Sequence, residues 1–440
     1  MLIANGKRCH DFGLPTPTIA PTNPALSFNT VQAAEVGAEM EISINGKQKK
    51  AFEEVMSAAY SNYNSIKCFF LDEPGGSGKT YLYKTLLSSI RGKGDVALPV
   101  ASTGLAANLL DGGRTYHSQF KLPIPILETL VSSMRLTSEE ANFTRRSKAI
   151  IWDEATMAPA DALRCTDKLL QDIMKNDLPF GGKTIFLGGD FRQTLLVLPH
   201  GNRAAIVEKT LKFHPLWSKF HILQLDNNVP ATDPNFSSWL IKLGDGSLTN
   251  EYSLHDDIFQ IPNEMVCTGS LVEQIFGHSL QASNVHQFAN KAILCPKNIH
   301  VDEINQQVLD LLDGETVTYF STDVIDDATP EDANNYPVEF LSALSPSGMP
   351  LHTLNIKVGA IIMLLRNLNT KRGLCNGTRL LVQSLKKHII IAKILTGLAA
   401  GTTIFIPRID LAPANTDLPF VLRRRQFPIK LAFAMTINKS

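Results

Sequence analysis

The stretch "FFLDEPGGSGKTYLY" at residues 69–83 constrains the fold more than any other part of the sequence. It nearly matches the pattern G-x-x-x-x-G-K-[ST], in which backbone amides of a glycine-rich loop wrap phosphate oxygens at the start of a helix. Gly78, Lys79 and Thr80 supply the second half of the pattern, but Glu73 occupies the position of its first glycine. "IKCFFLDE" predicts a buried strand before the loop, and "TYLYKTLLSSI" predicts a helix after it. An ordinary glycine-rich turn before a helix is the alternative for this segment taken alone.

Apolar strands and amphipathic helices alternate from residue 41 onward, and a second alternating region begins near residue 291. This order predicts an α/β protein with parallel strands and crossover helices. We expect a flexible leader at 1–40, a first domain at 41–225, a connecting region at 226–290 and a second domain at 291–440. Short runs with turn signals at about 367–428, such as "HIIIAKIL" and "TTIFIPRI", predict a small β-barrel-like module inserted in the second domain.

The composition is that of an ordinary globular protein, with 42 Lys and Arg balanced by 42 Asp and Glu. A uniformly basic surface that coats nucleic acid is therefore excluded, although a local basic channel is not. The six cysteines are scattered without a C-x-x-C pair, which predicts a reduced chain without a structural metal. No apolar run reaches the roughly 18–20 residues of a membrane span and no secretory pattern is present, so we expect an intracellular protein outside the membrane.

Two further strand ends carry the residue types that phosphoryl transfer needs. "KAIIWDEAT" places Asp153 and Glu154 after an apolar strand, where one carboxylate can hold magnesium and the other can polarise an attacking water. By itself this pair also fits a solvated strand end. "KTIFLGGDFRQTLLVLP" places Asp190, Arg192 and Gln193 at the end of another strand, and ligands of open parallel sheets gather at that edge. Gln193 can sense the terminal phosphate, whereas Arg192 fits either that site or a structural ion pair.

Hydroxyl, amide and aromatic groups follow the next strand in "VASTGLAANLL" and "GGRTYHSQFKLPI". Such groups suit single-stranded nucleic acid, because N–H and OH donors hold backbone phosphates and aromatic rings stack on bases. Taken alone, His117 fits a core or surface position, and Phe120 fits the core equally well. Their order in the chain favours a small DNA-binding insertion in the first domain.

Several of these blocks resemble the motifs of one helicase family. The blocks are "PGGSGKT", "ASTGLAANLLDGGRTYHSQFKLPI", "IIWDEATM", "GGDFRQTLLVLPHG", "KVGAIIMLLRNLNTKRGLCNGTRL" and "LRRRQFPIKLAFAMTINKS". They are similar to the motifs of the petite-integration-frequency (PIF) family of DNA helicases, in the variety that Helitron-type transposable elements carry. The resemblance runs from about residue 41 to the end of the chain.

The resemblance implies an ATP-dependent DNA helicase that moves 5′ to 3′ on single-stranded DNA, with ATP as substrate, Mg²⁺ as cofactor and DNA junctions as further partners. It implies two RecA-like P-loop domains with parallel sheets, the second incomplete and carrying the β-barrel-like insertion. It also implies roles in DNA repair, recombination and telomere maintenance, and hence a nuclear location. The residues that match the family motifs are Gln48 for adenine, Gly75, Gly76, Ser77, Gly78, Lys79 and Thr80 for phosphate, Thr80 and Asp153 for the metal, Lys79, Asp153, Glu154 and Gln193 for catalysis, and Thr103, Thr115, His117, Ser118, Phe120, Thr436 and Lys439 for DNA. Asn45, which precedes Gln48, fits the role of a helix cap.

Three departures from the family pattern predict impaired hydrolysis. Glu73 replaces the first loop glycine, Pro230 stands where the family has a phosphate-binding arginine, and the chain stops at Ser440 before the block that carries a second arginine. We therefore expect a fragment of a longer reading frame. A non-catalytic, transposon-derived remnant that binds DNA or nucleotide is the alternative. A P-loop kinase with a small-molecule acceptor is disfavoured, because it requires neither "GGDFRQ" nor a second α/β domain.

Overall fold

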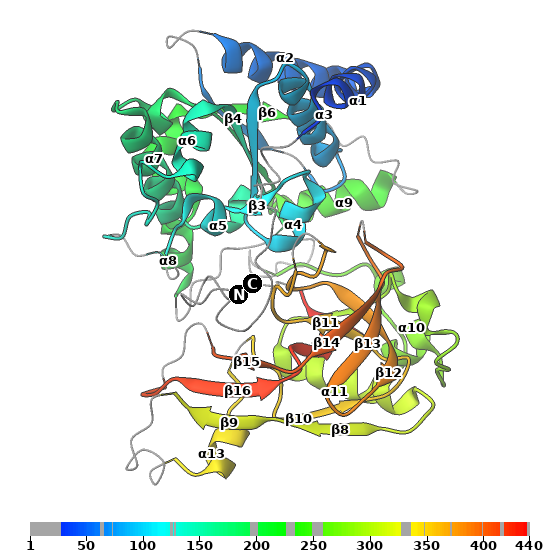
Figure 1. Ribbon diagram of the computed structural model, residues 1–440. Coiled ribbons are helices and arrows are strands. Elements are labelled where there is room, and N and C mark those ends of the chain that lie inside the picture. Colours follow the sequence, from blue (N-terminus) through cyan, green and yellow to red (C-terminus); the bar gives the residue numbers. More distant parts are fainter. Residues whose placement is uncertain are drawn as a thin grey trace.

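Figure 1 shows the computed structural model, in which the first half of the chain forms the upper body and the second half forms the lower body. The structure describes residues 28–61, 66–72, 74–123, 126, 129–193, 201–225, 234–248, 258–326, 336–346, 348–369, 372–397, 399–413 and 418–437. Glu73, Pro230 and Lys439, all of which bear on the predicted sites, lie outside the described residues. The same holds for residues 1–27 of the predicted leader.

Six strands of the first domain form a sheet in the order β3–β2–β4–β5–β1–β6, and the pairings in it are parallel. The strands are β1 (Cys68–Asp72), β2 (Val96–Ala101), β3 (Arg114–Thr115), β4 (Ser147–Asp153), β5 (Thr184–Gly189) and β6 (His221–Gln224). Parallel strands have their carboxyl ends at the same edge of a sheet. Because β4, β5 and β1 are neighbours, the three stretches with predicted phosphate chemistry end side by side.

Alternate residues of the central strands face opposite sides of this sheet. Phe70 of β1 packs with Ile150 of β4 in one core cluster, whereas Leu71 and Ile151 belong to another. The first cluster includes α5, α6 and α7, and the second includes α2 and α3, so helices cover both faces. The helices of this domain are α2 (Gly46–Tyr60), α3 (Lys79–Gly92), α4 (Gly104–Leu109), α5 (Tyr116–Phe120), α6 (Glu139–Arg146), α7 (Ala160–Met174) and α8 (Arg203–Glu208).

The prediction of a flexible leader does not hold for residues 30–40, which form most of helix α1 (Thr30–Ser43). Asn29 caps this helix, since its side chain accepts hydrogen bonds from two backbone amides of the first turn. The helix crosses α3 closely at two glycines. A Cβ on Gly37 would lie 3.0 Å from the Ser89 backbone nitrogen, and a Cβ on Gly92 would lie 2.6 Å from Ala34 Cα. Helix α1 has only weak apolar periodicity, so the sequence did not predict it. The close approach at these two glycines allows α1 to pack on α3.

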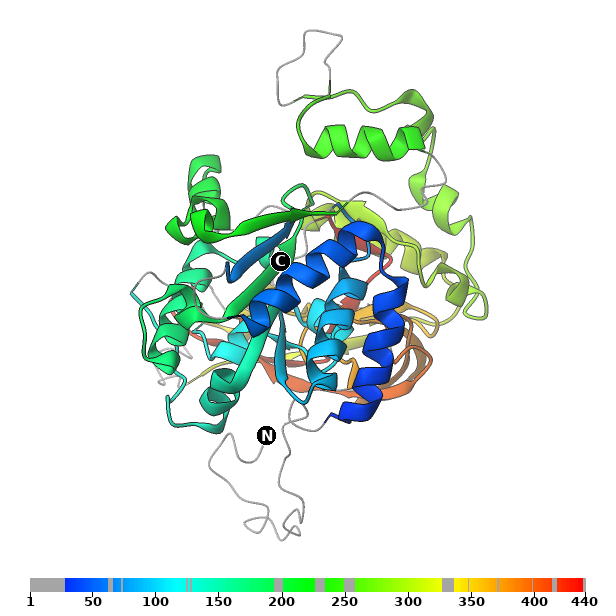
Figure 2. The same cartoon turned by 90° about the horizontal axis from the view of Figure 1, so that it is seen from above.

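The predicted connecting region contains α9 (Pro234–Gly244) and α10 (Leu271–Phe276). Figure 2 shows α9 projecting from the body of the molecule. Three aromatic rings organise this projection: Phe236 stacks on Trp239 with ring centroids 6.2 Å apart, and Phe259 meets Trp239 edge-on at 6.3 Å. The region is thus partly helical and carries its own aromatic contacts.

Antiparallel strands dominate the second domain. β14–β13–β12–β11–β17 form a five-stranded sheet, β15–β16–β9 form a three-stranded sheet, and β10 pairs with β8. The strands are β8 (Val317–Phe320), β9 (Thr322–Ile325), β10 (Thr353–Ile356), β11 (Ile361–Leu364), β12 (Arg379–Leu385), β13 (Ile389–Ile394), β14 (Thr403–Pro407), β15 (Ile409–Leu411), β16 (Leu422–Gln426) and β17 (Ile429–Leu431). The helices are α11 (Asn298–Leu311) and α13 (Val338–Ala343).

The β-rich module is broader than the predicted range of about 367–428. Its sheets include β9, β11 and β17, which lie outside that range. For example, Ile362 of β11 pairs with Leu380 of β12 on one side and with Leu431 of β17 on the other. In the described part of this domain, the parallel component is the pair β7 (Ile293–Cys295) and β18 (Ala434–Thr436). Asn305 of α11 holds β18 in place, since its Oδ1 accepts the amide hydrogen bond of Ala434 at 2.9 Å. The predicted class, two RecA-like P-loop domains of which the second carries a β-rich insertion, is confirmed, and the parallel pairing described for the second domain is that of β7 with β18.

Candidate nucleotide-binding site

The loop before α3 has the backbone of an anion-binding site. Gly76 and Gly78 have φ angles of 85° and 88°, a left-handed conformation that residues with a side chain rarely adopt. Gly78 is the N-cap of α3 and provides no side-chain hydrogen bond to the helix. By contrast, α2, α4, α5 and α6 each begin with a side chain that bonds an amide of the first turn. The start of α3 thus offers backbone donors and a helix dipole that favour an anion.

Gln48 lies beside this loop and is almost fully buried. Its Oε1 accepts a hydrogen bond from the Asn45 amide at 3.0 Å, and the Asn45 side chain accepts one from the Gln48 amide at 3.0 Å. This reciprocal capping box starts α2, as predicted for Asn45. Gln48 Nε2 also donates to the Ser77 carbonyl at 3.1 Å. The side chain therefore braces the loop, and its amide keeps a second N–H and a second lone pair that an adenine base could use.

Three charged side chains meet at the carboxyl edge of the sheet. Lys79 Nζ lies 2.6 Å from Glu154 Oε1 and 3.5 Å from Asp153 Oδ1. The Asp153 side chain is only 2% exposed, whereas those of Lys79 and Glu154 are 15% and 24% exposed. Burial raises the pKa of Asp153, and the neighbouring Lys79 ammonium opposes that rise. The structure therefore brings together the three residues that the sequence predicts for the hydrolytic centre.

The backbone directs Glu154 toward the loop. Its φ angle is 51°, a left-handed conformation that costs of the order of 1 kcal/mol or more in a residue with a side chain. The Glu154 amide donates to Asp153 Oδ1 at 2.9 Å, so the first carboxylate fixes the direction of the second. Strain of this kind is often retained at functional sites because the function requires the geometry. Here it separates the roles of two adjacent carboxylates, one buried at the strand end and one turned toward Lys79.

The donor types at this edge fit a hard divalent cation. Asp153 offers a buried carboxylate and Thr80 a hydroxyl at the start of α3, and oxygen ligands of this kind suit Mg²⁺. Among the described residues, no group of three or more His, Cys, Asp and Glu side chains could hold a metal ion. Such a cation would therefore need oxygens from a phosphate ligand or water to complete its coordination. When bound, it would neutralise charge on the transferred phosphoryl group.

Gln193 lies against the phosphate-binding loop. Its Nε2 is 3.1 Å from the position that a Cβ on Gly75 would take. The Gln193 amide donates to the Asp190 carbonyl at 3.3 Å, in the turn that follows β5. The side chain is thus within reach of the loop that would hold phosphates. This position agrees with the predicted role of Gln193 in sensing a terminal phosphate.

Arg192 adopts the structural alternative of its two predicted roles, since it forms ion pairs with three carboxylates. Its Nε lies 2.7 Å from Asp245 Oδ1, and its Nη1 lies 3.0 Å from Asp190 Oδ1 and 3.3 Å from Asp72 Oδ1. The hydrogen bond that Arg192 donates to Asp245 contributes most to a raised pKa of the Arg192 guanidinium. Asp72 and Asp245 were not among the residues predicted from the sequence. No linear pattern relates the ends of β1 and α9 to a residue that follows β5.

Two residues predicted to contact DNA are helix caps. Thr103 Oγ1 accepts a hydrogen bond from the Ala106 amide at 3.2 Å at the start of α4. Thr115 Oγ1 accepts one from the Ser118 amide at 3.4 Å at the start of α5. The Ser118 residue itself is exposed. Figure 1 shows α4 and α5 at the lower edge of the first domain, toward the second domain. The caps position these two helix starts at the side of the domain where a strand of DNA was predicted.

Phe120 does not have the exposure that base stacking needs, so the prediction that it contacts DNA is wrong. Its side chain is fully buried, and its ring centroid lies 6.2 Å from that of Trp152 in the core of the first domain.

His117 lies at the boundary of that core, with its ring centroid 3.9 Å from that of Tyr116, and burial lowers the pKa of His117 to about 4. His117 is therefore neutral at physiological pH, so it can offer DNA a hydrogen bond but no charge.

The two domains touch where α4 meets residues 366–369 and 372–376, which belong to one of the family-like blocks. Asn108 Nδ2 donates to Cys375 Sγ at 2.8 Å. A Cβ on Gly104 would lie 3.5 Å from Asn367 Oδ1. Thr436, which the sequence also assigns to DNA, lies half-buried on β18, and Lys439 is outside the described residues. The structure thus brings the Thr103 block next to a second-domain loop that the site prediction did not include.

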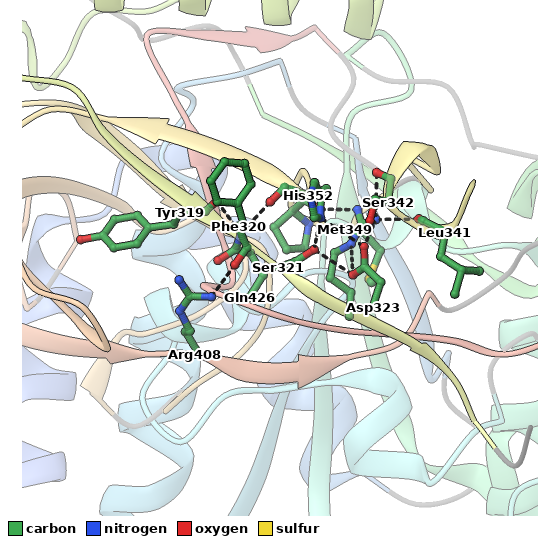
Figure 3. Close-up of polar contacts among 12 residues, drawn as sticks. Tyr319, Phe320, Ser321, Asp323, Leu341, Ser342, Met349, His352, Arg408 and Gln426 are labelled. Atoms are coloured by element: carbon green, nitrogen blue, oxygen red, sulfur yellow. Dashed lines mark hydrogen bonds and ion pairs between the residues drawn. The ribbon is translucent and has the colours of Figure 1, made fainter. Parts of the chain in front are cut away.

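A polar cluster in the second domain contains serine, histidine and aspartate but lacks the geometry of a hydrolytic triad (Figure 3). Ser321 Oγ lies 2.8 Å from His352 Nδ1, and Asp323 Oδ2 lies 3.4 Å from the same ring nitrogen. In a triad, the nucleophile and the acid meet opposite nitrogens. Asp323 is also paired with Arg424 at 2.7 Å, and both side chains are fully buried. The cluster holds β9 and β16 together and has no catalytic arrangement.

The glycine-rich helix start after β1 and the paired carboxylates after β4 lie at the same edge of one parallel sheet, and this arrangement places the chain among the P-loop nucleotide-binding proteins. None of the described helices combines the length and apolar character of a membrane-spanning segment. The PIF1-like helicase family matches residues 43–253, and the 2B domain of DNA helicase Pif1 matches residues 339–385. The chain belongs to the PIF1-like helicase family.

Individual relatives agree with this assignment. The chain is 27% identical over 381 residues to the ATP-dependent DNA helicase Pif1 of Bdellovibrio bacteriovorus, a match that covers 84% of this chain and 75% of the relative. It is also 27% identical over 384 residues to the ATP-dependent DNA helicase PIF1 of Xenopus laevis, covering 84% of this chain and 52% of that protein. The chain therefore spans about three quarters of the bacterial relative and about half of the amphibian one.

Solved structures share the fold. The crystal structure of Bacteroides Pif1 bound to ssDNA matches with a TM-score of 0.60 and 21% identity, over 89% of this chain and 82% of that chain. The crystal structure of Pif1 helicase from Candida albicans matches with a TM-score of 0.58 and 21% identity, over 89% and 85%. At these identities the similarity establishes the fold of the chain.

Proposed function

We propose that this protein is an ATP-dependent DNA helicase that moves 5′ to 3′ on single-stranded DNA. The observation that carries the proposal is the meeting of Lys79, Asp153 and Glu154 at 2.6 and 3.5 Å, beside the helix start that lacks a side-chain cap. Lys79 would bind the outer phosphates, Asp153 and Thr80 would hold Mg²⁺, and Glu154 would polarise the attacking water. The relatives named as ATP-dependent DNA helicases support the same reaction.

Single-stranded DNA is the proposed partner, with DNA junctions as a further one. Thr103 and Thr115 cap helices at the edge where the first domain approaches the second, and His117 and Ser118 lie on the second of these helices. A related structure is described as bound to ssDNA, and another concerns unwinding at forked dsDNA. We include in this proposal roles in DNA repair, recombination and telomere maintenance, and a nuclear location.

We further propose that hydrolysis by this chain is slow. Glu73 places a carboxylate in the loop sequence, and Pro230 stands where the family pattern has an arginine. A like charge about 4 Å from a phosphate costs about 4 kcal/mol at an effective dielectric near 20, before relief from magnesium and Lys79. Loss of an arginine acts on the rate instead, by about 10³ to 10⁵ in related hydrolases. Glu73→Gly is thus expected to improve nucleotide affinity, whereas Pro230→Arg is expected to increase turnover.

The test is a steady-state ATPase assay with and without single-stranded DNA, alongside displacement of a labelled strand from forks with a 5′ or a 3′ tail. We expect slow hydrolysis that DNA stimulates, displacement that requires the 5′ tail, and loss of both activities in Lys79→Ala. Lys84→Ala is a control, because Lys84 lies in the same helix away from the loop. DNA binding without nucleotide turnover would support the non-catalytic alternative, and phosphorylation of a small acceptor would contradict the helicase proposal.

A further inference from the structure

Arg192 joins three parts of the first half of the chain that are distant in sequence. Asp72 is the last residue of β1, directly before the phosphate-binding loop, and Asp190 follows the last residue of β5. Asp245 follows the last residue of α9. The Arg192 guanidinium contacts all three carboxylates, at 3.3, 3.0 and 2.7 Å respectively. Its planar fork suits this arrangement, since separate N–H groups point toward separate acceptors.

We propose that Arg192 is a positioning residue that holds Gln193 against the phosphate-binding loop and couples this position to helix α9. The inference rests on the proposed function, because it assigns Gln193 to the phosphate site. The Arg192 guanidinium is paired with the three carboxylates, so we assign it a role through its neighbour Gln193. A displacement of α9 would therefore be transmitted to the reacting phosphate through the Arg192–Asp245 pair.

Short-range geometry limits how far Arg192 and Gln193 can move independently. The Arg192 amide donates to Asp190 Oδ1 at 2.9 Å, and the Gln193 amide donates to the Asp190 carbonyl at 3.3 Å. Asp190 is nearly fully buried, so this turn is anchored in the sheet edge. Gln193 Nε2 lies 3.1 Å from the position of a Cβ on Gly75. A shift of this turn by about 1 Å would thus move the Gln193 side chain relative to the loop.

The α9 side of the contact is equally close. A Cβ on Gly244 would lie 2.9 Å from Arg192 Cβ, so the last turn of α9 rests directly on the arginine side chain. The Arg192 side chain is 26% exposed and that of Asp245 is 45% exposed, so this ion pair is accessible to solvent and can open. The pairs with Asp72 and Asp190 are more enclosed, with 23% and 4% of the carboxylate side chains exposed. Arg192 therefore has a fixed side toward the sheet and an exchangeable side toward α9.

Removal of Arg192 would leave three carboxylates together beside the phosphate-binding loop. Their mutual repulsion would displace the turn that carries Gln193, and misplacement of a reacting group by about 1 Å can cost about 100-fold in rate. We expect kcat to fall about ten- to a hundredfold in Arg192→Met, with a smaller change in KM for ATP. Arg192→Lys keeps the charge but not the fork, and should recover only part of the loss.

A double-mutant cycle separates positioning from general support of the fold. If Arg192 acts through Gln193, the kcat of Arg192→Met/Gln193→Ala should equal that of Gln193→Ala alone within about twofold. Arg164→Met is the matched control, because Arg164 also pairs with a carboxylate on the first domain, at 3.8 Å from Asp161, and its side chain is 33% exposed. Losses that multiply in the double variant, or a fall of kcat in Arg164→Met alone as large as that in Arg192→Met, would overturn the proposal.

Hydrogen exchange of the full chain tests the coupling without any nucleotide. Arg192→Met should accelerate amide exchange both in α9 (Pro234–Gly244) and in residues 190–193. Asp245→Asn should accelerate exchange in α9 and leave residues 190–193 closer to their original rate. Unchanged exchange of α9 in Arg192→Met would refute the coupling. If the unmodified chain bound no nucleotide, the proposed function would fail, and this measurement would still decide whether Arg192 links the two segments.

Discussion

In the first domain, Lys79 meets Asp153 and Glu154 at the edge of a parallel sheet with 15% of its side chain exposed, whereas Arg424 and Asp323 of the second domain pair with both side chains fully buried. Lys79 has two carboxylates within 3.5 Å, one buried and one near the surface. Arg424 is more completely paired, because Asp323 accepts from two of its nitrogens and the Pro350 and Leu341 carbonyls accept further bonds.

The difference shows which charges can change partners. A lysine at a solvent-accessible sheet edge can exchange a carboxylate for a phosphate, because water and a second carboxylate compensate during the exchange. An arginine without solvent contact cannot leave its carboxylate without exposing a buried charge. The first arrangement fits chemistry, and the second fixes the relative position of β9 and β16. Both clusters join a basic side chain to a carboxylate, so the distinction rests on the exposure of the basic group and on the number of its fixed partners.

The largest expected effect concerns the first cluster. Glu154→Gln should lower the DNA-stimulated ATPase rate by about 10² to 10⁴, because the amide cannot polarise water as a carboxylate does. The free energy of unfolding should change little. Glu139→Gln, in the exposed first turn of α6, is the control and should leave the rate unchanged. Full activity in Glu154→Gln would show that another residue activates the water.

The second cluster should respond in stability instead. Arg424→Met leaves Asp323 buried without its partner and should lower the free energy of unfolding of this region by about 3–5 kcal/mol. The paired variant Arg424→Met/Asp323→Leu removes both charges and should recover most of that loss. Urea unfolding, together with hydrogen exchange in β9 and β16, measures both effects. A double variant as unstable as the single one would show that the carbonyl contacts of Arg424, rather than its ion pair, hold this sheet.

Phe120 sharpens the comparison within the predicted DNA site. Phe120→Leu should lower the free energy of unfolding by about 1 kcal/mol, because the substitution removes aromatic contact in the core. Affinity for single-stranded DNA, measured by fluorescence anisotropy, should stay the same for the folded protein. Ser118→Ala, at the neighbouring exposed position, serves as the comparison. A weaker affinity for single-stranded DNA in fully folded Phe120→Leu would indicate that Phe120 contacts DNA directly.

The smallest expected effect is a pH dependence from His117. Burial lowers its pKa from 6.5 to about 4, so the folded protein favours the neutral imidazole. The related stability is fully present above pH 6.5 and is lost as the pH falls through about 4. Solvent screening at this half-buried position should limit the loss to about 1 kcal/mol or less. Between pH 6.5 and about 4, the free energy of unfolding should depend less on pH in His117→Gln than in the unmodified chain. An equal pH dependence in the two proteins would show that folding does not lower the pKa of His117.

The meeting of Lys79, Asp153 and Glu154 was predictable because the signals for it are local. A strand, a glycine-rich loop and a helix follow one another in the sequence around Lys79, and Asp153-Glu154 ends a second apolar strand. Parallel pairing then brings these strand ends together wherever the sheet forms. Gln193 follows the same rule after β5. Capping by Asn45 was predictable for the same reason, since a cap and its partner lie within one turn.

Residues outside that rule were not predictable from the sequence. Phe120 occurs in a block that matches a DNA-contacting motif, and only the packing of α5 against β4 shows that its ring is in the core. α1 lacks a strong apolar stripe, and its contact with α3 depends on Gly37 and Gly92. The true extent of the β-rich module depends on the pairing of β11 with β17, strands that are far apart in the sequence.

The sequence by itself determined the phosphate-binding loop, the order of strands and helices in the first domain, and the identity of Lys79, Asp153, Glu154 and Gln193, because each depends on neighbours within one strand–loop–helix unit. The tertiary structure alone decided the contacts of Arg192 with Asp72 and Asp245, and the burial of Arg424 with Asp323. Ion pairs between distant segments depend on how sheets and helices pack, and no spacing along the chain encodes which carboxylate an arginine will meet.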